Sequence, residues 1–264
     1  MSDLKIQYAS DLHLEMSGCS AYMHEHPLVP SAPVLLLAGD IHVIGSPFFA
    51  GHRFWDWCAD NFERTVIVPG NHEYYGGEPA VDDTVNAPGG WRLDVRDNVT
   101  YVNNRAVTLP DLDLTVLATT LWSPVDPLNE MAVNTRMNDC RLIRYGDGIL
   151  KASGMTAMHR RCLDWLGKAL NDCHTGHKVV LTHHCPAIIE DPRYGTNNLS
   201  SAFVMPLEHF VESSGADAWV FGHTHYNAGR GRRLGSTTLL VNQLGYAPDD
   251  VCPDFDPAAT FTLP

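Results

Sequence analysis

The stretch VFGHTHYN, residues 220–227, ends an apolar run with two histidines one residue apart, His223 and His225. Successive side chains along a β-strand point to opposite sides, so residues i and i+2 share a side. If the strand geometry persists through this segment, both imidazoles point the same way. Polar residues after a strand can also form an ordinary turn, and the other strand ends of the chain decide between the two interpretations.

Four other short apolar runs end in polar clusters of the same kind. They are LKIQYAS (4–10) before Asp11 and His13, VLLLAG (34–39) before Asp40, TVIVPG (65–70) before Asn71, His72 and Glu73, and KVVLT (178–182) before His183 and His184. Runs that are short, nearly continuous and rich in β-branched residues are typical of strands buried on both faces. In open α/β sheets, ligands bind beyond the carboxyl ends of the strands. We therefore expect these polar side chains to form one site.

Three helices are predicted between the runs. The first covers 46–62, with Ser46 as its cap, and the third covers 201–215, with a break at Pro206. The second covers 153–173, where apolar residues recur at spacings of three and four, at Met155, Met158, Cys162, Leu166 and Leu170.

Two further segments are rich in strands. Residues 99–122 predict successive strands with turns between them, and residues 232–246 predict one or two more. Because helices alternate with strands around this strand-rich middle, the sequence favours an α/β fold with a mixed sheet. A chain of 264 residues suits one large domain, and we expect a single catalytic domain over residues 1–264.

The composition limits the classes of partner. The chain has 18 Lys and Arg against 31 Asp and Glu, a formal net charge of −13. This acidity argues against long nucleic acids and anionic membranes, because phosphate contacts need Lys and Arg. Seven cysteines, with no C-x-x-C pair, argue against a disulfide framework and a thiolate zinc site. Together with the lack of a signal-peptide pattern, they lead us to expect a cytoplasmic protein.

The residue types at the strand ends are those of metal ligands. Carboxylate, imidazole and amide donors suit Zn, Mn, Fe or Ni rather than Ca or Mg alone. They are too many for one tetrahedral ion, so two ions are expected. A metal pair about 3.5–4 Å apart is typical of phosphoryl transfer and hydrolysis.

The ordered set of motifs resembles the calcineurin-like metallophosphoesterases. The segments SDLHLE, LAGDI, VPGNHEYY, VLTHHCP and FGHTH match that family's D-x-H, G-D, G-N-H-E, strand-end His and G-H-x-H patterns, and they extend from Asp11 to His225. The resemblance implies an αββα sandwich, in which two packed mixed β-sheets are flanked by helices. It also implies a mechanism in which water between the two metals becomes a hydroxide that attacks phosphorus.

Roles for individual residues follow from the same resemblance. The first metal would be held by Asp11, His13, Asp40 and His225. The second would be held by Asp40, Asn71, His183 and His223, with Asp40 bridging. His183 is chosen over His184 because the family's ligand directly follows the apolar run. His72 would bind no metal but would face the scissile phosphate and protonate the leaving group, and Glu73 would orient a ligand or His72.

The substrate pocket is less marked in the sequence. The segment RMNDCRLIRY (136–145) offers Asn138 and Arg141 as groups for the phosphate oxygens, although a solvated helix face explains Arg141 equally well. Tyr74, in a pair with Tyr75, is a candidate stacking wall for a ring, and Tyr246 is a candidate for closing the cleft.

We therefore predict a dinuclear metal-dependent phosphoesterase acting on small phosphate esters, with diesters slightly favoured by analogy with relatives that carry the same histidine. One alternative is a phosphatase acting on phosphoserine and phosphothreonine in proteins. Another, from a different class, is an interaction scaffold that kept the fold and lost the chemistry. The complete set of ligand types and His72 argues against the scaffold.

Overall fold

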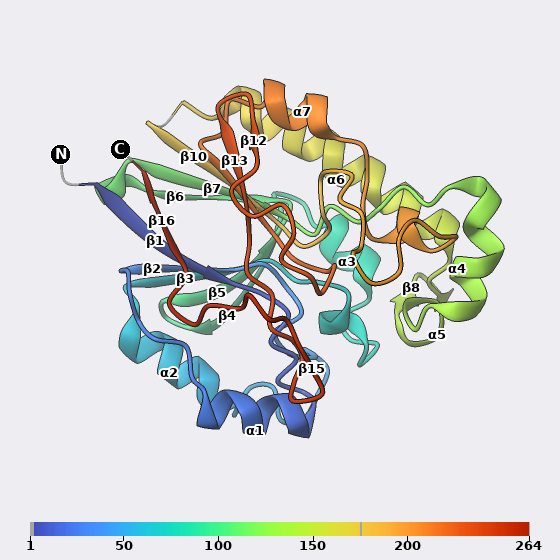
Figure 1. The fold of residues 1–264 in the computed structure, drawn as a ribbon, viewed down its shortest axis with the longest axis horizontal. Coiled ribbons are helices and arrows are strands. Elements are labelled where there is room, and N and C mark those ends of the chain that lie inside the picture. Colours follow the sequence, from blue (N-terminus) through green and yellow to red (C-terminus); the bar gives the residue numbers. More distant parts are fainter. Residues whose placement is uncertain (1–2, 175, 264) are drawn as a thin grey trace.

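The computed structural model describes residues 3–174 and 176–263, which form two six-stranded mixed sheets with helices outside them (Figure 1). The first sheet has the order β16-β1-β2-β3-β5-β4. Its strands are β1 (Leu4–Ala9), β2 (Val34–Leu37), β3 (Arg64–Ile67), β4 (Trp91–Arg96), β5 (Val99–Asn103) and β16 (Thr260–Leu263). The four central strands are parallel, whereas the edge strands β16 and β4 are antiparallel to their neighbours.

The second sheet has the order β12-β13-β11-β10-β7-β6. Its strands are β6 (Arg105–Leu109), β7 (Leu114–Thr119), β10 (His177–Thr182), β11 (Ala218–Phe221), β12 (Arg233–Leu234) and β13 (Thr237–Val241). Here too the central strands are parallel and the edges antiparallel. The predicted strand runs and the predicted α/β class, with two packed mixed sheets flanked by helices, are confirmed.

Three hydrophobic clusters hold the layers together. Side chains of both sheets, such as Ile6, Leu36, Val116 and Leu181, meet in the cluster between the sheets. A second cluster joins the outer face of the first sheet to α1 (Ser17–Glu25) and α2 (Arg53–Asn61). A third joins the outer face of the second sheet to α6 (Ala152–Asp172) and α7 (Glu208–Ser213). Because both faces of each sheet are covered, the central strands have nearly continuous apolar sequences.

The helix predictions are confirmed in part. The five apolar positions predicted for the second helix are all buried in α6. The break at Pro206 is present, since a 3₁₀ turn at Ser200–Ala202 (η4) precedes α7. The first helix was predicted to start too early. It begins only at Arg53, because the side chain of His52 accepts from the backbone N–H of Phe54 and caps the helix there.

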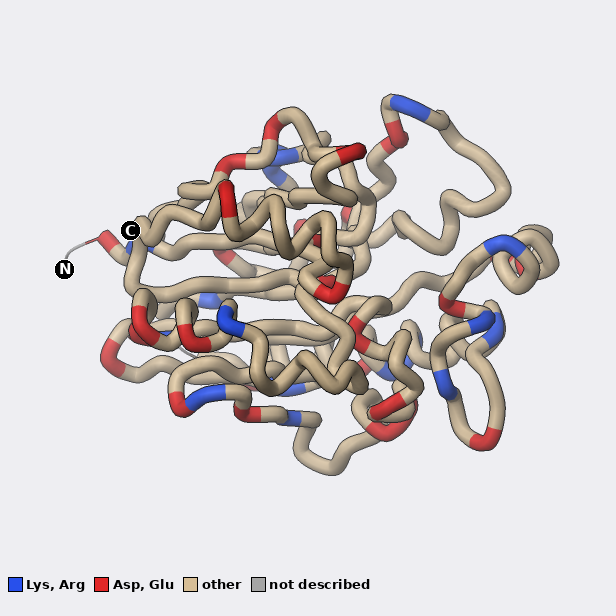
Figure 2. The backbone as a smooth tube through the Cα atoms, turned by 90° about the horizontal axis from the view of Figure 1, so that it is seen from below, with Lys and Arg blue, Asp and Glu red and all other residues tan. Residues whose placement is uncertain are grey.

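Shorter elements surround one end of the sandwich, opposite the two termini (Figure 1). They are η1 (His72–Tyr74), α3 (Val81–Val85), η3 (Pro127–Asn129), α4 (Glu130–Arg136), α5 (Asp139–Leu142), β8 (Arg144–Tyr145), β9 (Gly148–Ile149), β14 (Gly245–Tyr246) and β15 (Asp250–Val251). The 3₁₀ turn η2 (Pro110–Leu112) instead connects β6 to β7, at the end where the termini lie. Along the described chain, no helix is both long enough and apolar enough to cross a membrane. Figure 2 shows Asp and Glu positions spread along the chain with Lys and Arg among them.

Candidate active site

The candidate ligands follow strand ends with an unusual backbone. Strands β1, β2 and β11 stop before the polar residues, and φ is positive at Asp11 (55°), His13 (46°), Asp40 (55°), His223 (74°) and His225 (51°). Non-glycine residues rarely adopt this left-handed conformation, and it concentrates at functional sites. The prediction that strand alternation aligns His223 and His225 is therefore wrong, because β11 ends at Phe221 and the two residues lie in a turn beyond it.

Glycines in the motifs let these turns approach one another. A Cβ atom on Gly70 would lie 2.2 Å from Oδ1 of Asp40, and one on Gly222 would lie 2.6 Å from Oδ2 of Asp11. Both distances are far below van der Waals contact, so a side chain at either position would displace a candidate ligand.

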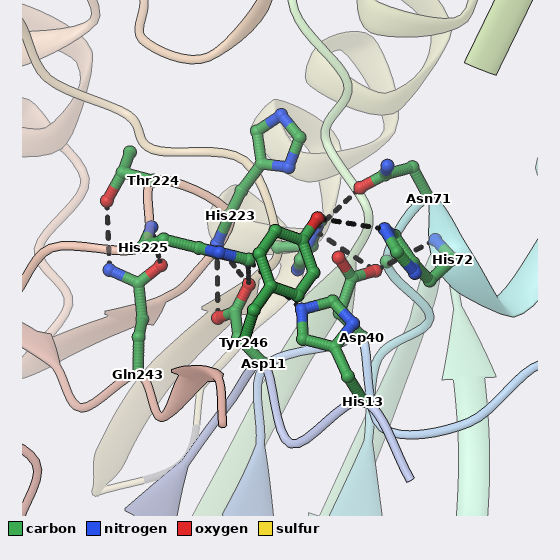
Figure 3. Close-up of polar contacts among 12 residues, drawn as sticks. Asp11, His13, Asp40, Asn71, His72, His223, Thr224, His225, Gln243 and Tyr246 are labelled. Carbon is green, nitrogen blue, oxygen red and sulfur yellow. Dashed lines mark hydrogen bonds and ion pairs between the residues drawn. The ribbon is translucent and has the colours of Figure 1, made fainter. Parts of the chain in front are cut away.

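A first group of ligand atoms belongs to Asp11, His13, Asp40 and His225, which lie within 4.8 Å of one another. The Nε2 atoms of His13 and His225 are 3.0 Å apart, and Nε2 of His225 is 3.2 Å from Oδ1 of Asp11. Figure 3 shows these side chains gathered around Asp40, with Tyr246 beside them.

A second group comprises Asp40, His183 and His223, again within 4.8 Å, so Asp40 is common to both groups. Nδ1 of His183 is 2.7 Å from the carbonyl oxygen of Ala38, which leaves Nε2 to face Oδ1 of Asn71 at 3.1 Å and Oδ1 of Asp40 at 3.4 Å. A histidine ligand held in this way by its other nitrogen is typical of metal sites.

The residue next in the chain, His184, belongs to neither group. Its Nδ1 is 3.3 Å from the carbonyl oxygen of Thr120, and its ring packs on Trp122. His183, and not its neighbour, therefore lies among the candidate ligands.

Buried charge gives these groups their electrostatic character. Asp11 and Asp40 are buried carboxylates surrounded by imidazoles. Burial alone would raise the pKa of the Asp40 carboxyl, but the His183 and His72 imidazoles hold that pKa well below its ordinary value. Buried carboxylates kept ionised beside several imidazole nitrogens are a donor set that fits transition-metal cations.

His72 lies beside both groups and has partners of its own. Its backbone N–H donates to Oδ1 of Asp40 at 2.9 Å, and its Nδ1 is 2.9 Å from Oε1 of Glu15. Burial opposes protonation of His72, but Asp40 and Glu15 together raise its pKa to about 9. Its Nε2 is 3.5 Å from the hydroxyl of Tyr246. Sequence reasoning missed Glu15, although the SDLHLE motif contains it two residues after His13.

Glu73 supports the loop that carries Asp40. Its carboxylate accepts hydrogen bonds from the backbone N–H groups of Asp40 (2.9 Å), Ile41 (2.8 Å) and Gly70 (2.7 Å). It therefore orients a candidate ligand from outside the site, one of the two roles expected for it.

Asn71 is oriented by a carboxylate that the sequence did not single out for this role. Its Nδ2 donates to Oδ1 of Asp139 at 2.9 Å, and the Tyr75 hydroxyl donates to the same oxygen at 2.6 Å. Asp139 is buried, and burial raises the pKa of its carboxyl. Because the amide nitrogen points to Asp139, the amide oxygen of Asn71 faces His183.

Of the three predicted substrate residues, one lines the pocket and two do not. Asn138 lines the pocket that opens from the candidate ligands. Arg141 does not: it is exposed on α5, and its guanidinium bonds to the backbone carbonyl of Thr135, which matches the solvated-helix alternative. The prediction for Arg141 is therefore wrong.

The prediction for Tyr74 is also wrong. Tyr74 is fully buried in the core, with its hydroxyl 2.8 Å from Oγ1 of Thr84, whereas Tyr75 lines the pocket. Tyr74 is the last residue of the 3₁₀ turn η1 and Tyr75 follows it directly, so the two side chains point in different directions and only Tyr75 faces the cavity. Tyr246 does lie at the pocket, as expected.

Comparison with known proteins shows the family of the chain. The chain is 27% identical over 267 residues to "Uncharacterized protein L509" of Acanthamoeba polyphaga mimivirus, covering 92% of this chain and 91% of that protein. The solved structure of phosphopantetheinyl hydrolase from Mycobacterium tuberculosis superposes with a TM-score of 0.63 at 16% identity, covering 96% of this chain and 97% of that one. A family model described as calcineurin-like phosphoesterase matches residues 4–227. The chain therefore belongs to the calcineurin-like phosphoesterase family.

Proposed function

We propose that this protein is a phosphoesterase that uses two metal ions to hydrolyse small phosphate esters, with diesters slightly favoured. The observation that carries the proposal is the pair of ligand groups that share Asp40 at the inner end of one pocket, with His72 beside them. The first ion would be held by Asp11, His13, Asp40 and His225, and the second by Asp40, Asn71, His183 and His223.

The donor set supports Mn, Fe, Zn or Ni as the ions, because it combines imidazole, carboxylate and amide donors. When bound, such a pair supplies an activated water at neutral pH and neutralises charge on the phosphoryl oxygens. Asp40 would hold both ions. The contacts that orient Asn71 and His183 would keep these two ligands in position for the second ion.

His72 would act as the acid of the reaction. Glu15 holds Nδ1, so Nε2 is the nitrogen that can face a substrate in the pocket. A protonated imidazole there would donate to the leaving oxygen as the P–O bond breaks. The same positive charge would help to stabilise the phosphoryl oxygens.

The chain retains every ligand type of the family, and the structure gathers these residues beside His72, which supports an enzyme over an interaction scaffold. We keep one catalytic domain over residues 1–264, a cytoplasmic location, and the lack of a long nucleic-acid or membrane partner as predictions. No observation specifically favours a protein phosphatase.

Turnover of bis(p-nitrophenyl) phosphate and p-nitrophenyl phosphate tests the proposal. Purified protein should hydrolyse both with added Mn²⁺, lose activity on chelation and regain it when Mn²⁺ returns. Asp40→Ala should abolish turnover, whereas Glu63→Gln, at an exposed position outside the pocket, should not. Activity that survives chelation, or metal analysis showing one ion per active chain, would contradict a paired site.

A further inference from the structure

The pocket extends far beyond the candidate ligands. Its volume is about 1090 Å³, and it reaches from Asp40 and His72 to the loop of residues 188–206. Pockets for small molecules commonly measure about 300–1,000 Å³. A phosphate esterified to a short alcohol would fill only the inner end, so the outer part has room for a longer group.

Apolar side chains form much of the outer wall. Met137, Phe203 and Val204 line it between the loop and α5, and Phe203 stacks on the His223 ring at a centroid distance of 4.7 Å. On the rim, Ile188 and Tyr194 are 52% and 72% exposed. These side chains could bury a hydrocarbon chain or a ring, and such burial is favourable.

The charged residues of the outer wall are mainly negative. Its carboxylates are Asp126, Glu190, Asp191 and Asp250, and its cations are Arg136 and Arg193. The four carboxylates outnumber the two cations, and only Arg193 is paired with carboxylates. Arg193 bonds to Asp191 at 3.3 Å and to Asp250 at 3.1 Å, and Arg136 donates to Oδ1 of Asn198 at 2.9 Å. A second phosphate or carboxylate on the substrate would therefore meet net negative charge.

We infer that the preferred substrate carries on its phosphate an extended, largely apolar group without further negative charge. This inference rests on the proposed function and narrows it. Dinucleotides, nucleoside polyphosphates and other polyanions are disfavoured, because they would place a second anion beside Glu190 and Asp126.

Three p-nitrophenyl phosphodiesters test the inference, because they share one leaving group and differ only in the second ester group. These groups are methyl, hydroxyhexyl with a terminal hydroxyl, and carboxypentyl with a terminal carboxylate. For the Mn²⁺-loaded enzyme, kcat/KM should be about tenfold higher for the hydroxyhexyl than for the methyl ester, through burial of the added methylenes. It should be about fivefold lower for the carboxypentyl than for the hydroxyhexyl ester, and added salt should narrow that difference.

The double variant Asp126→Asn with Glu190→Gln replaces both carboxylates with neutral amides. It should bring kcat/KM for the carboxypentyl ester closer to kcat/KM for the hydroxyhexyl ester. Asn keeps the cap that Asp126 provides to the backbone N–H of Leu128. Glu63→Gln, an exposed carboxylate outside the pocket, should leave the ratio unchanged. Hydrolysis of all three esters with equal kcat/KM, or preference for the carboxypentyl ester, would overturn the inference and leave the proposed function intact. Failure to hydrolyse any of them would overturn the proposed function.

Discussion

The carboxylate of Glu15 lies 2.9 Å from Nδ1 of His72 and 3.5 Å from Nδ1 of His13. Glu15 is mostly buried, and although burial would raise its pKa, its contacts with the two histidines lower that pKa to about 2. Glu15 is therefore an anion next to the group proposed as the acid. It links a candidate ligand of the first metal to the residue that would protonate the leaving oxygen.

His72→Gln is expected to lower kcat/KM for alkyl phosphodiesters by about 10²–10⁴-fold, the usual contribution of a positioned acid. Nitrophenolate leaves without a proton, so aryl esters should lose least. The measurement is kcat/KM across esters of graded leaving-group pKa, together with metal content. An equal loss along the whole series would make His72 a fixed charge rather than an acid, and loss of a metal would contradict the ligand assignment around Asn71.

Glu15→Gln is expected to show the same dependence on the leaving group with a smaller loss, about 10–100-fold for alkyl esters. The neutral amide keeps a polar partner for Nδ1 but no longer stabilises the imidazolium that donates the proton. Metal content and the rate with aryl esters should change less than the rate with alkyl esters. If alkyl and aryl esters lose the same factor, Glu15 supports the site only structurally.

Gly70→Ala is expected to disrupt the Asp40 loop. The added Cβ would lie 2.2 Å from Oδ1 and 2.7 Å from the backbone N of Asp40, so the candidate bridging ligand must move. Overpacking of this kind costs about 1–3 kcal/mol of unfolding free energy. We expect weaker Mn²⁺ binding by titration calorimetry and a lower midpoint in urea. Gly51→Ala is the control, since its Cβ would meet nothing within 4 Å; equal behaviour of the two variants would contradict the prediction.

The central strands could be predicted because burial on both faces leaves a continuous apolar run in the sequence. The antiparallel edge strand β16 could not. In β16, Thr260 and Thr262 alternate with Phe261 and Leu263, and its partner β1 lies at the other end of the chain. Pairing between such distant segments has no local signal in the sequence.

The candidate site likewise contains some residues that the sequence could predict and others that it could not. The candidate ligands could be predicted because each lies within a few residues of a strand end, and the family motifs fix their order. Asp139 could not be assigned, because it reaches Asn71 through a contact between residues 68 positions apart. The choice between Tyr74 and Tyr75 depended on the phase of a 3₁₀ turn, which the sequence does not reveal.

The substitution His159→Asn is expected to reduce the amount by which the free energy of unfolding falls between neutral pH and mild acid. His159 is buried on α6, with Nδ1 3.1 Å from the carbonyl oxygen of Leu121, and burial lowers its pKa below 6.5. Folding favours the neutral form of His159. Its contribution to the free energy of unfolding is therefore complete above pH 6.5, and it is lost as the pH falls toward the lowered pKa of the folded state. Each unit of lowering corresponds to about 1.4 kcal/mol.

Asn keeps a donor for the same carbonyl but does not titrate. Urea unfolding at about pH 7.5 and about pH 5 should therefore show a smaller difference between the two conditions for the variant than for the wild type. His209→Asn, at an exposed position of α7, is the control and should leave the difference unchanged. An unchanged difference in the His159 variant would contradict the prediction.

Asp139→Leu is expected to weaken binding of the second metal by about 10–100-fold, the usual cost of removing a group that orients a ligand. Without Oδ1 of Asp139, the Asn71 amide loses the acceptor that fixes its nitrogen and can rotate its oxygen away from His183. Asp139→Asn keeps a carbonyl oxygen at that place and should retain most of the affinity. Calorimetric titration of the metal-free proteins with Mn²⁺ should then show two sites in the wild type and the Asn variant. In the Leu variant, one site should keep its affinity and one should be weakened. Two undisturbed sites in a folded Leu variant would show that Asn71 is held by other contacts, and loss of both sites would show that Asp139 supports the whole centre rather than the second metal.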